Sequence, residues 1–121
     1  MVQGDFSIPS GLIGAAELLT RKDRPTAIFC FNDEMAIGVF DHARKAGLRV
    51  PQDLSVIGFD DIRFSQYLVP ALTTVSQPML QIGQETVRLM LEILRGTGRR
   101  PKSVTLPHKL MVRDSTASPP K

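Results

Sequence analysis

The sequence predicts an α/β domain with a parallel sheet. Two short apolar runs, residues 26–31 (TAIFCF) and 54–59 (LSVIGF), have the length and residue types of strands buried on both faces. Between them, apolar side chains recur at helical spacing from Met35 to Ala43, and Gly47 suits the position just after a helix. A crossover of this length joins parallel strands through a right-handed connection. Residues 26–60 are therefore predicted to form one strand–helix–strand unit.

Polar residues follow both predicted strands directly. Asn32 and Asp33 come after the first run, and Asp60 and Asp61 come after the second. The carboxyl ends of parallel strands meet at one edge of the sheet, and ligands bind outside that edge. The sequence alone therefore predicts a polar rim beside which a small molecule can bind.

The flanking segments complete the α/β pattern. A helix is predicted to begin with Ser10 as its N-cap and to end before Pro25. Thr73 to Ser76 is predicted as a short strand, and Gln77-Pro78 opens a long helix that ends at Gly96. The buried face of that helix is predicted to comprise Met79, Ile82, Gly83, Val87, Met90, Leu91 and Leu94. Residues 103–106 and 109–112 are expected to be extended, and the small, polar, proline-rich end from Ser115 to Lys121 is expected to be frayed.

Composition is that of an ordinary globular domain. The chain has 121 residues, of which 42% are hydrophobic and 22% charged, which suits one domain. A two-lobed binding protein would need roughly twice this length. The formal net charge of +3 comes from scattered basic residues, so it does not by itself indicate nucleic-acid binding. We interpret the densest basic group as a solvated loop, with a phosphate-binding patch as the alternative; it comprises Arg95, Arg99, Arg100 and Lys102.

The cysteine content and the absence of export signals bear on metal binding, disulfides and the cellular compartment of the protein. Cys30 is the single cysteine and lies inside an apolar run, so we expect a buried thiol and neither a disulfide nor a zinc site. We expect no cofactor. No signal-peptide pattern follows Met1 and no apolar run is long enough to span a bilayer, so we expect a cytoplasmic protein without membrane contact.

Five segments, in order along residues 4–116, together resemble one family. The chain is similar to the lac repressor (LacI/GalR) family in the pattern GD-aromatic-S/T…G, in ND-x-MA-x-G, in VP-x-D-[LV]-S-[VI]-[IV]-G-[FY]-D, in P-x-LTT-[IV]-x-QP, and in [LI]G with a late R-x-ST. The residues that carry these patterns are Gly4-Asp5-Phe6-Ser7 with Gly11, residues 31–38 (FNDEMAIG), residues 47–61 (GLRVPQDLSVIGFDD), residues 70–75 (PALTTV) with Gln77-Pro78, and Ile82-Gly83 with Arg113-Asp114-Ser115-Thr116. Each pattern is weak alone, but the five in one order are specific.

The resemblance implies a periplasmic-binding-protein-like lobe and a domain organisation. Residues 1–114 correspond to the C-terminal part of an effector-binding and dimerisation domain, namely its second lobe with crossover segments, and residues 115–121 to a flexible tail. The helix-turn-helix headpiece and most of the first lobe of the family are absent from this chain. The implied function is effector sensing: a small sugar or a nucleoside or purine binds and controls DNA binding by the headpiece.

The resemblance implies a ligand role for two residues of the predicted rim. Asp60 corresponds to the family's ligand-binding aspartate, and a carboxylate can accept charge-assisted hydrogen bonds from vicinal hydroxyls. Asn32 offers both a donor and an acceptor. From the residues alone, Asp60 could instead cap the next turn, Asn32 could cap the following helix, and Asp61 could be solvated or turn-forming. Asp33 is interpreted mainly as the helix cap and only secondarily as a ligand contact.

Three further residues complete the implied ligand set. Phe6 would supply an apolar face that stacks on a sugar ring or a base, and Gln77 would reach the ligand from the interlobe crossover. Ser7 is a weaker candidate. The alternatives are a core role for Phe6 and a helix-cap or surface role for Gln77.

A second set of residues predicts a homodimer. Ile37 lies off the main apolar stripe of its helix, so that helix carries apolar groups on more than one face. The corresponding helix of the family lies at the dimer interface, and the interface is predicted to include Ile37, Phe40 and Leu68. Packing on two sides within one lobe is the alternative.

Two other functions were weighed against effector sensing. An exported solute-binding protein shares the fold, although the segment around Pro51 to Asp60 favours the repressor family. A phosphoryl-transfer enzyme could use Asp60-Asp61 with Thr74, but no lysine follows a predicted strand at the same rim and no GxxxxGK loop is present. We therefore expect no catalytic residues.

Overall fold

A computed structural model describes residues 1–96 and 103–119, which fall into two units. The first unit comprises Met1–Ser76 with Leu110–Lys121, and the second comprises Gln77–Lys109. The predicted basic loop lies outside the described residues except for Arg95, which ends the helix of the second unit. Each unit is described by itself.

The sheet contains the predicted parallel strands in the order β1-β2-β3-β4. β1 (Ala27–Phe29) pairs in parallel with β2 (Ser55–Asp60), and β2 pairs in parallel with β3 (Thr73–Ser76). The fourth strand is the short β4 (Lys109–Met111). The α/β class and the parallel strand–helix–strand unit are therefore confirmed. The strand from Thr73 to Ser76 has the predicted bounds, whereas residues 103–106 form no strand.

The expectation that the first strand is buried on both faces is wrong. Ile28 and Cys30 point into the core, whereas the alternate residues Ala27, Phe29 and Phe31 are exposed. The exposed fractions of Phe29 and Phe31 are 52% and 59%, and their rings pack edge to face with centroids 5.9 Å apart. Helices cover one face of this strand, and nothing in the described chain covers the other.

Helix α1 (Ile8–Leu19) begins three residues earlier than predicted. Its N-cap is Ser7, whose side chain accepts a hydrogen bond from the Ser10 N–H at 3.2 Å. Ser10 lies inside the first turn, and its hydroxyl donates to the Ser7 carbonyl at 2.9 Å. The sequence offers two serines at cap-like positions, and with Ser7 as the cap Pro9 falls in the first turn, which suits proline.

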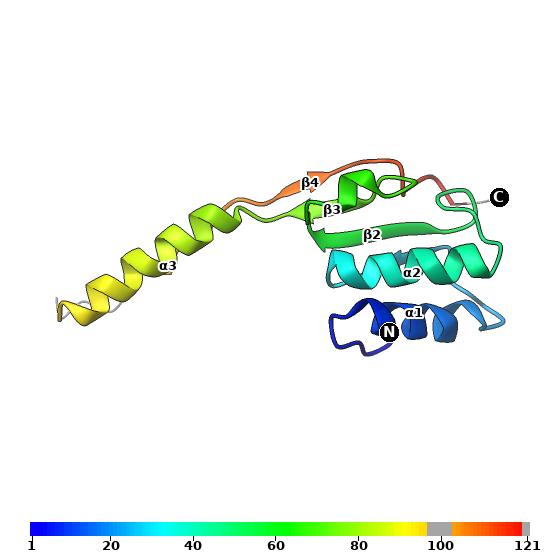
Figure 1. The fold of residues 1–121 in the computed structure, drawn as a ribbon, viewed down its shortest axis with the longest axis horizontal. Coiled ribbons are helices and arrows are strands. Elements are labelled where there is room, and N and C mark those ends of the chain that lie inside the picture. Colours follow the sequence, from blue (N-terminus) through cyan, green and yellow to red (C-terminus); the bar gives the residue numbers. More distant parts are fainter. Residues whose placement is uncertain (97–102, 120–121) are drawn as a thin grey trace. The chain divides into compact units, whose positions relative to one another are not determined.

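Helix α2 (Asp33–Lys45) runs beside α1 and connects β1 to β2 (Figure 1). A Cβ on Gly11 or on Gly38 would lie 2.1 Å from a backbone oxygen of the other helix, so the two glycines allow the close approach. Gly47 ends α2 as predicted, with φ of +72°, which glycine adopts without strain. The N–H groups of Gly47 and Leu48 donate back to the carbonyls of Arg44 and Ala43, which satisfies the last turn.

The core of the first unit lies between the sheet and these two helices. Its buried apolar residues come from both helices and the strands: Ala15, Leu19, Ile28, Cys30, Ala36, Val39, Ala43, Leu54, Val56 and Leu72. The short helix η1 (Ser65–Tyr67) lies in the connection between β2 and β3.

The C-terminal segment is ordered further than predicted. Ser115 was expected to begin a frayed tail, but it is fully buried. Its hydroxyl donates to the Val56 carbonyl at 2.6 Å and accepts from the Thr73 N–H at 2.8 Å. The Ala117 N–H donates to the Ser55 hydroxyl at 3.1 Å. The segment through Ala117 therefore joins the starts of β2 and β3, and composition alone could not reveal these long-range contacts.

The second unit contains α3 (Met79–Leu94), which follows Pro78 and ends before Gly96, as predicted. The predicted apolar stripe is present, but its burial is not: no residue of this helix is buried. Arg88 forms ion pairs with Glu85 and Glu92 on its polar side. An amphipathic pattern of this kind indicates an apolar face that can pack against a partner surface.

Candidate functional site

The parallel register places Asn32 and Asp60 at equivalent positions on one edge of the sheet. Phe29 in β1 is the register partner of Ile57 in β2, and Asn32 and Asp60 each follow their strand residue by three positions. In turn, Asp60 is the register partner of Ser76 at the end of β3. The shared polar edge that the sequence predicts is therefore present.

Asn32 links this edge to the N-terminal segment. Its Oδ1 accepts a hydrogen bond from the Met35 N–H at 2.8 Å, so Asn32 is the N-cap of α2. Its Nδ2 donates to the Phe6 carbonyl at 2.8 Å. Both polar groups of the side chain are thus engaged within the protein, so a ligand would have to share or replace one of these contacts.

Phe6 and Ser7 lie beside that contact in a tight turn. Phe6 has φ of +67°, and its side chain is 62% exposed, so it does not have the core role considered as the alternative. The Ser7 N–H and hydroxyl donate to Asp5 at 3.0 Å and 2.5 Å. These bonds, with that of Ser10, lower the pKa of Asp5 to about 2. The turn presents the Phe6 ring outward from the segment that Asn32 holds.

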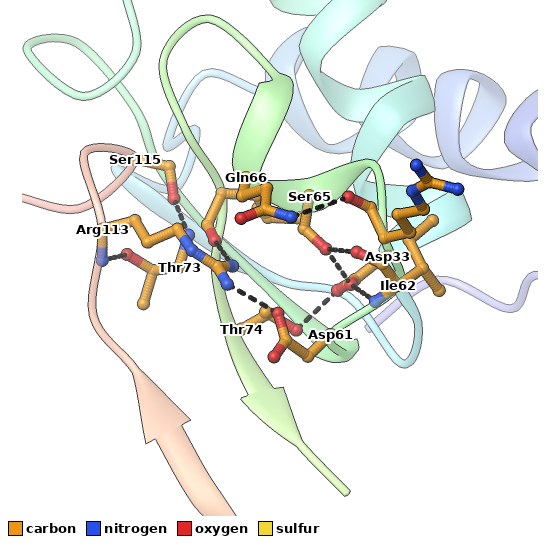
Figure 2. A network of polar contacts seen from close by, with 11 residues as sticks. Asp33, Asp61, Ile62, Ser65, Gln66, Thr73, Thr74, Arg113 and Ser115 are labelled. Carbon is orange, nitrogen blue, oxygen red and sulfur yellow. Dashed lines mark hydrogen bonds and ion pairs between the residues drawn. The ribbon is translucent and has the colours of Figure 1, made fainter. Parts of the chain in front are cut away.

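Asp33 is a buried structural residue, which corrects both predictions made for it. It is fully buried, and Asn32 is the helix cap. Its carboxylate accepts hydrogen bonds from the Ile62 N–H at 2.8 Å, the Ser65 hydroxyl at 2.8 Å and the Thr74 hydroxyl at 2.6 Å (Figure 2). Three donors bind it internally, and its full burial favours a structural role over contact with a ligand. Thr74, considered as a partner in phosphoryl transfer, is likewise bound to Asp33.

Gly58 makes room for the Asp33 carboxylate. A Cβ at Gly58 would lie 2.1 Å from Asp33 Oδ1 and 2.9 Å from Leu72 Cδ2. Because Gly58 and Thr74 are register partners in β2 and β3, the carboxylate lies against both strands. The glycine is visible in the sequence, but the sequence does not reveal that the Asp33 carboxylate packs against it.

The turn after β2 carries Asp60 and Asp61 in an unusual backbone conformation. Their φ angles are +107° and +57°, a region that non-glycine residues rarely adopt. Asp61 forms an ion pair with Arg113 at 2.7 Å, and the two side chains are only 19% and 18% exposed. Asp61 was expected to be solvated or turn-forming, and this expectation did not include the ion pair with Arg113.

Arg113 is a residue of this site that the sequence analysis did not assign. Besides Asp61, its guanidinium donates to the Leu72 carbonyl at 2.8 Å, and its backbone N–H donates to the Thr73 hydroxyl at 2.9 Å (Figure 2). The late R-x-ST pattern includes Arg113, but a partner 52 positions away leaves no local signal in the sequence.

Gln77 and the three predicted interface residues fall elsewhere. Gln77 is half-buried and begins the second unit. Ile37 is half-buried on α2, and Phe40 and Leu68 pack partly against the core. Ile37 and Phe40 also line a surface hollow of about 520 Å³ with Leu48, Val50 and Pro70 among its other walls.

That hollow is not lined by Asn32 or Asp60, and neither is a second one on the first unit. The second, of about 220 Å³, is lined by residues 27–31 in and after β1, by α1, by Met35 and Val39 of α2 and by residues 1–3. Within residues 1–96 and 103–119, no three histidine, cysteine, aspartate or glutamate residues are grouped as metal ligands. A search of the same residues finds no helix that is long and apolar enough to cross a membrane.

Comparisons with known proteins agree with this architecture. The model of the family described as "Periplasmic binding protein-like domain" matches residues 4–116. The HTH-type transcriptional repressor PurR of Yersinia enterocolitica is 42% identical over 120 residues, which is 99% of this chain and 35% of that protein. This chain thus spans about a third of the length of the curated relatives it matches.

Solved structures give the same result. A LacI family transcriptional regulator from Enterococcus faecalis V583, with bound ribose, superposes with a TM-score of 0.88 at 37% identity, over 99% of this chain and 44% of that one. The dimeric lac repressor with an 11-residue C-terminal deletion gives a TM-score of 0.86 at 35% identity, over 96% and 42% of the two chains.

The chain belongs to the periplasmic binding protein-like domain family. Within that family, the resemblance to lac repressor-type regulators drawn from the five sequence patterns is confirmed by these relatives.

Proposed function

We propose that this chain is the effector-sensing and dimer-forming part of a LacI-type bacterial transcriptional regulator. Its effector is a small sugar or a nucleoside or purine, and the effector controls DNA binding by a helix-turn-helix outside this chain. A ribose-bound regulator and a purine-named repressor among the similar proteins support this class of ligand. Relatives that are repressors favour this role over that of an exported solute-binding protein, so the protein acts in the cytoplasm.

The observation that carries the proposal is the placement of Asp60. It lies at the carboxyl end of β2, level with Asn32 in the register of the sheet, on a backbone with positive φ. Strained backbone of this kind is concentrated at functional sites, so it motivates a functional role. A carboxylate there would accept hydrogen bonds from two vicinal hydroxyls, which gives strength and direction to sugar binding.

Neighbouring residues would complete the recognition. The exposed Phe6 ring would stack on the apolar face of a sugar ring or on a base. The Asn32 side-chain amide donates to the Phe6 carbonyl. Any movement of this amide towards a ligand would therefore require the Phe6 carbonyl to move as well. Gln77 would approach from the crossover, and Ser7 would contribute only after releasing Asp5.

The proposed mechanism is a population shift without covalent chemistry. The effector would bind one arrangement of the complete domain more tightly than another, and this difference in affinity would bias the spacing of paired headpieces. In this mechanism the chain supplies one wall of the cleft and no catalytic residue.

Dimerisation would use the surface around Ile37, Phe40 and Leu68. The hollow beside Ile37 and Phe40 gives this face a shape that a second copy can fill. Two of the similar solved structures are described as lac repressor dimers. Light scattering is expected to show a dimer that Phe40→Asp dissociates, and a wild-type monomer at all concentrations would contradict this.

A titration followed by NMR tests the ligand proposal. In ¹⁵N-labelled chain, D-ribose, adenosine and guanine are added in turn, and at least one is expected to move the amide signals of Phe6, Asn32 and Asp60 saturably. Asp60→Ala is expected to abolish the shifts, whereas Asp41→Ala, on the surface of α2, is expected to leave them unchanged. Saturable shifts that persist in Asp60→Ala would contradict the proposal.

A further inference from the structure

The turn that carries Asp60 needs to be held in place. Asp60 and Asp61 both have positive φ, and neither is a glycine, so the unaided chain disfavours this conformation. On the N-terminal side of the turn, pairing of β2 with β3 fixes the backbone, since Asp60 is the register partner of Ser76. The downstream side has no strand pairing, so its conformation depends on side-chain contacts.

The side chains of Asp33 and Arg113 both contact this downstream side. The buried Asp33 carboxylate accepts the Ile62 N–H at 2.8 Å, directly after the turn. Arg113 binds the Asp61 carboxylate at 2.7 Å. Asp33 belongs to the packed interior, whereas Arg113 reaches the turn from the C-terminal segment.

Arg113 is itself fixed at two other points. Its Nη1 donates to the Leu72 carbonyl at 2.8 Å, and its backbone N–H donates to the Thr73 hydroxyl at 2.9 Å, so its guanidinium is anchored to the start of β3. Two positions later, the buried Ser115 joins β2 and β3. Because the guanidinium is fixed to the strand, it cannot move with Asp61 away from the sheet. The ion pair therefore restrains the position of the Asp61 side chain.

We propose that Arg113 is a positioning residue for ligand binding: its ion pair with Asp61 holds the Asp60–Asp61 turn in the positive-φ conformation that presents the Asp60 carboxylate. This inference rests on the proposed ligand role of Asp60. It makes the C-terminal segment, which reaches the turn through the Arg113–Asp61 ion pair, a determinant of affinity.

Three variants separate positioning from direct contact. Arg113→Gln removes the ion pair, and Asp61→Ala removes the pair and retains a side chain that disfavours positive φ. Asp61→Gly also removes the pair, but glycine adopts positive φ freely. If Arg113 acts by holding the backbone, Asp61→Gly is expected to retain the positive-φ conformation and the ligand affinity. Arg113→Gln and Asp61→Ala are expected to lose both. Arg44→Gln, an exposed partner of Asp41 on α2, is the matched control.

The first readout is spectroscopic and needs no ligand. In the full 121-residue chain, positive φ at residues 60 and 61 gives a strong intraresidue HN–Hα NOE and a reduced one-bond Cα–Hα coupling. These signatures are expected in wild type, Arg44→Gln and Asp61→Gly, and are expected to weaken in Arg113→Gln and Asp61→Ala. Unchanged signatures in both of the latter variants would overturn the proposal.

The second readout is the Kd for D-ribose or adenosine. Arg113→Gln and Asp61→Ala are expected to weaken binding roughly tenfold, the size of effect that releasing one left-handed residue would give, whereas Asp61→Gly stays near wild type. An Asp61→Gly variant as weak as Asp61→Ala would overturn positioning and indicate direct contact by Asp61. Asp60→Ala separates the two claims: if it binds normally, the ligand role fails, while the spectroscopic result still decides whether Arg113 holds the turn.

Discussion

The two units of the chain differ in what becomes of their apolar side chains. In Met1–Ser76 with Leu110–Lys121, the helices and strands bury each other's apolar faces and enclose a carboxylate with three donors. In Gln77–Lys109, α3 has an equally regular apolar stripe and buries no residue. A helix of this length is only marginally stable without tertiary packing. The comparison shows that a sequence pattern specifies a face, whereas burial depends on a partner surface.

The largest difference is expected from removing the buried carboxylate. Asp33→Ala leaves the Ile62 N–H and the hydroxyls of Ser65 and Thr74 without their acceptor. The loss in the free energy of unfolding is expected to be about 4 kcal/mol, since each buried unsatisfied donor costs about 1–3 kcal/mol and the hydroxyls can partly reorient. Urea denaturation followed by circular dichroism measures it.

Asp41→Ala is the matched control for this change. Asp41 also accepts two charged donors, but on the surface of α2, so its loss is expected to change stability by less than about 1 kcal/mol. Equal effects of the two substitutions would show that Asp33 is not the interior anchor described here.

A pair of leucines compares the two units directly. Leu72 is fully buried in the first unit, and Leu94 on α3 is 74% exposed. Leu72→Ala is expected to cost about 3 kcal/mol of unfolding free energy, whereas Leu94→Ala is expected to cost less than about 0.5 kcal/mol. A large loss from Leu94→Ala would mean that α3 is packed in solution and that the contrast between the units is false.

A smaller effect than that of Leu72→Ala is expected from the pH dependence of Cys30. Burial, and secondarily the nearby Asp33 charge, raise the pKa of this thiol from 9.0 to about 12. Because the folded pKa lies above the unfolded value, the contribution is fully present below about pH 9 and is lost as the pH rises towards 12. Unfolding free energy is expected to fall by roughly 1 kcal/mol between pH 9 and 10.

Cys30→Ala isolates this contribution from other groups that titrate in alkali. The variant is expected to be less stable at pH 7, because a buried side chain is truncated, but to show a shallower decline above pH 9. Parallel pH profiles for the variant and wild type would exclude the thiol as the cause.

Local signals in the sequence were sufficient for much of the fold. The bounds of β3, the end of α2 at Gly47 and the shared edge of Asn32 and Asp60 all follow from residue type and spacing. These features depend on neighbours in sequence or on the regular geometry of parallel strands. They could therefore be predicted without knowledge of distant contacts.

The features that were missed depend on residues far apart in the chain. Asp33 looks like a helix cap in sequence, and only its contacts with Ser65 and Thr74, 32 and 41 positions away, make it a buried anchor. Ser115 lies in a polar, proline-rich end whose composition predicts fraying, and Arg113 lies just before that end. Composition indicates only the average tendency of such a segment to be disordered. Specific long-range hydrogen bonds can order it nonetheless.

The central claim is that Asp60 binds a hydroxylated small molecule at the carboxyl edge of the sheet. A crystal structure of the chain grown with D-ribose or adenosine tests it most directly. The account predicts a ligand hydroxyl within about 3 Å of an Asp60 carboxylate oxygen, with the Phe6 ring against the ligand. A ligand bound at another surface, with Asp60 making no contact to it, would contradict the account.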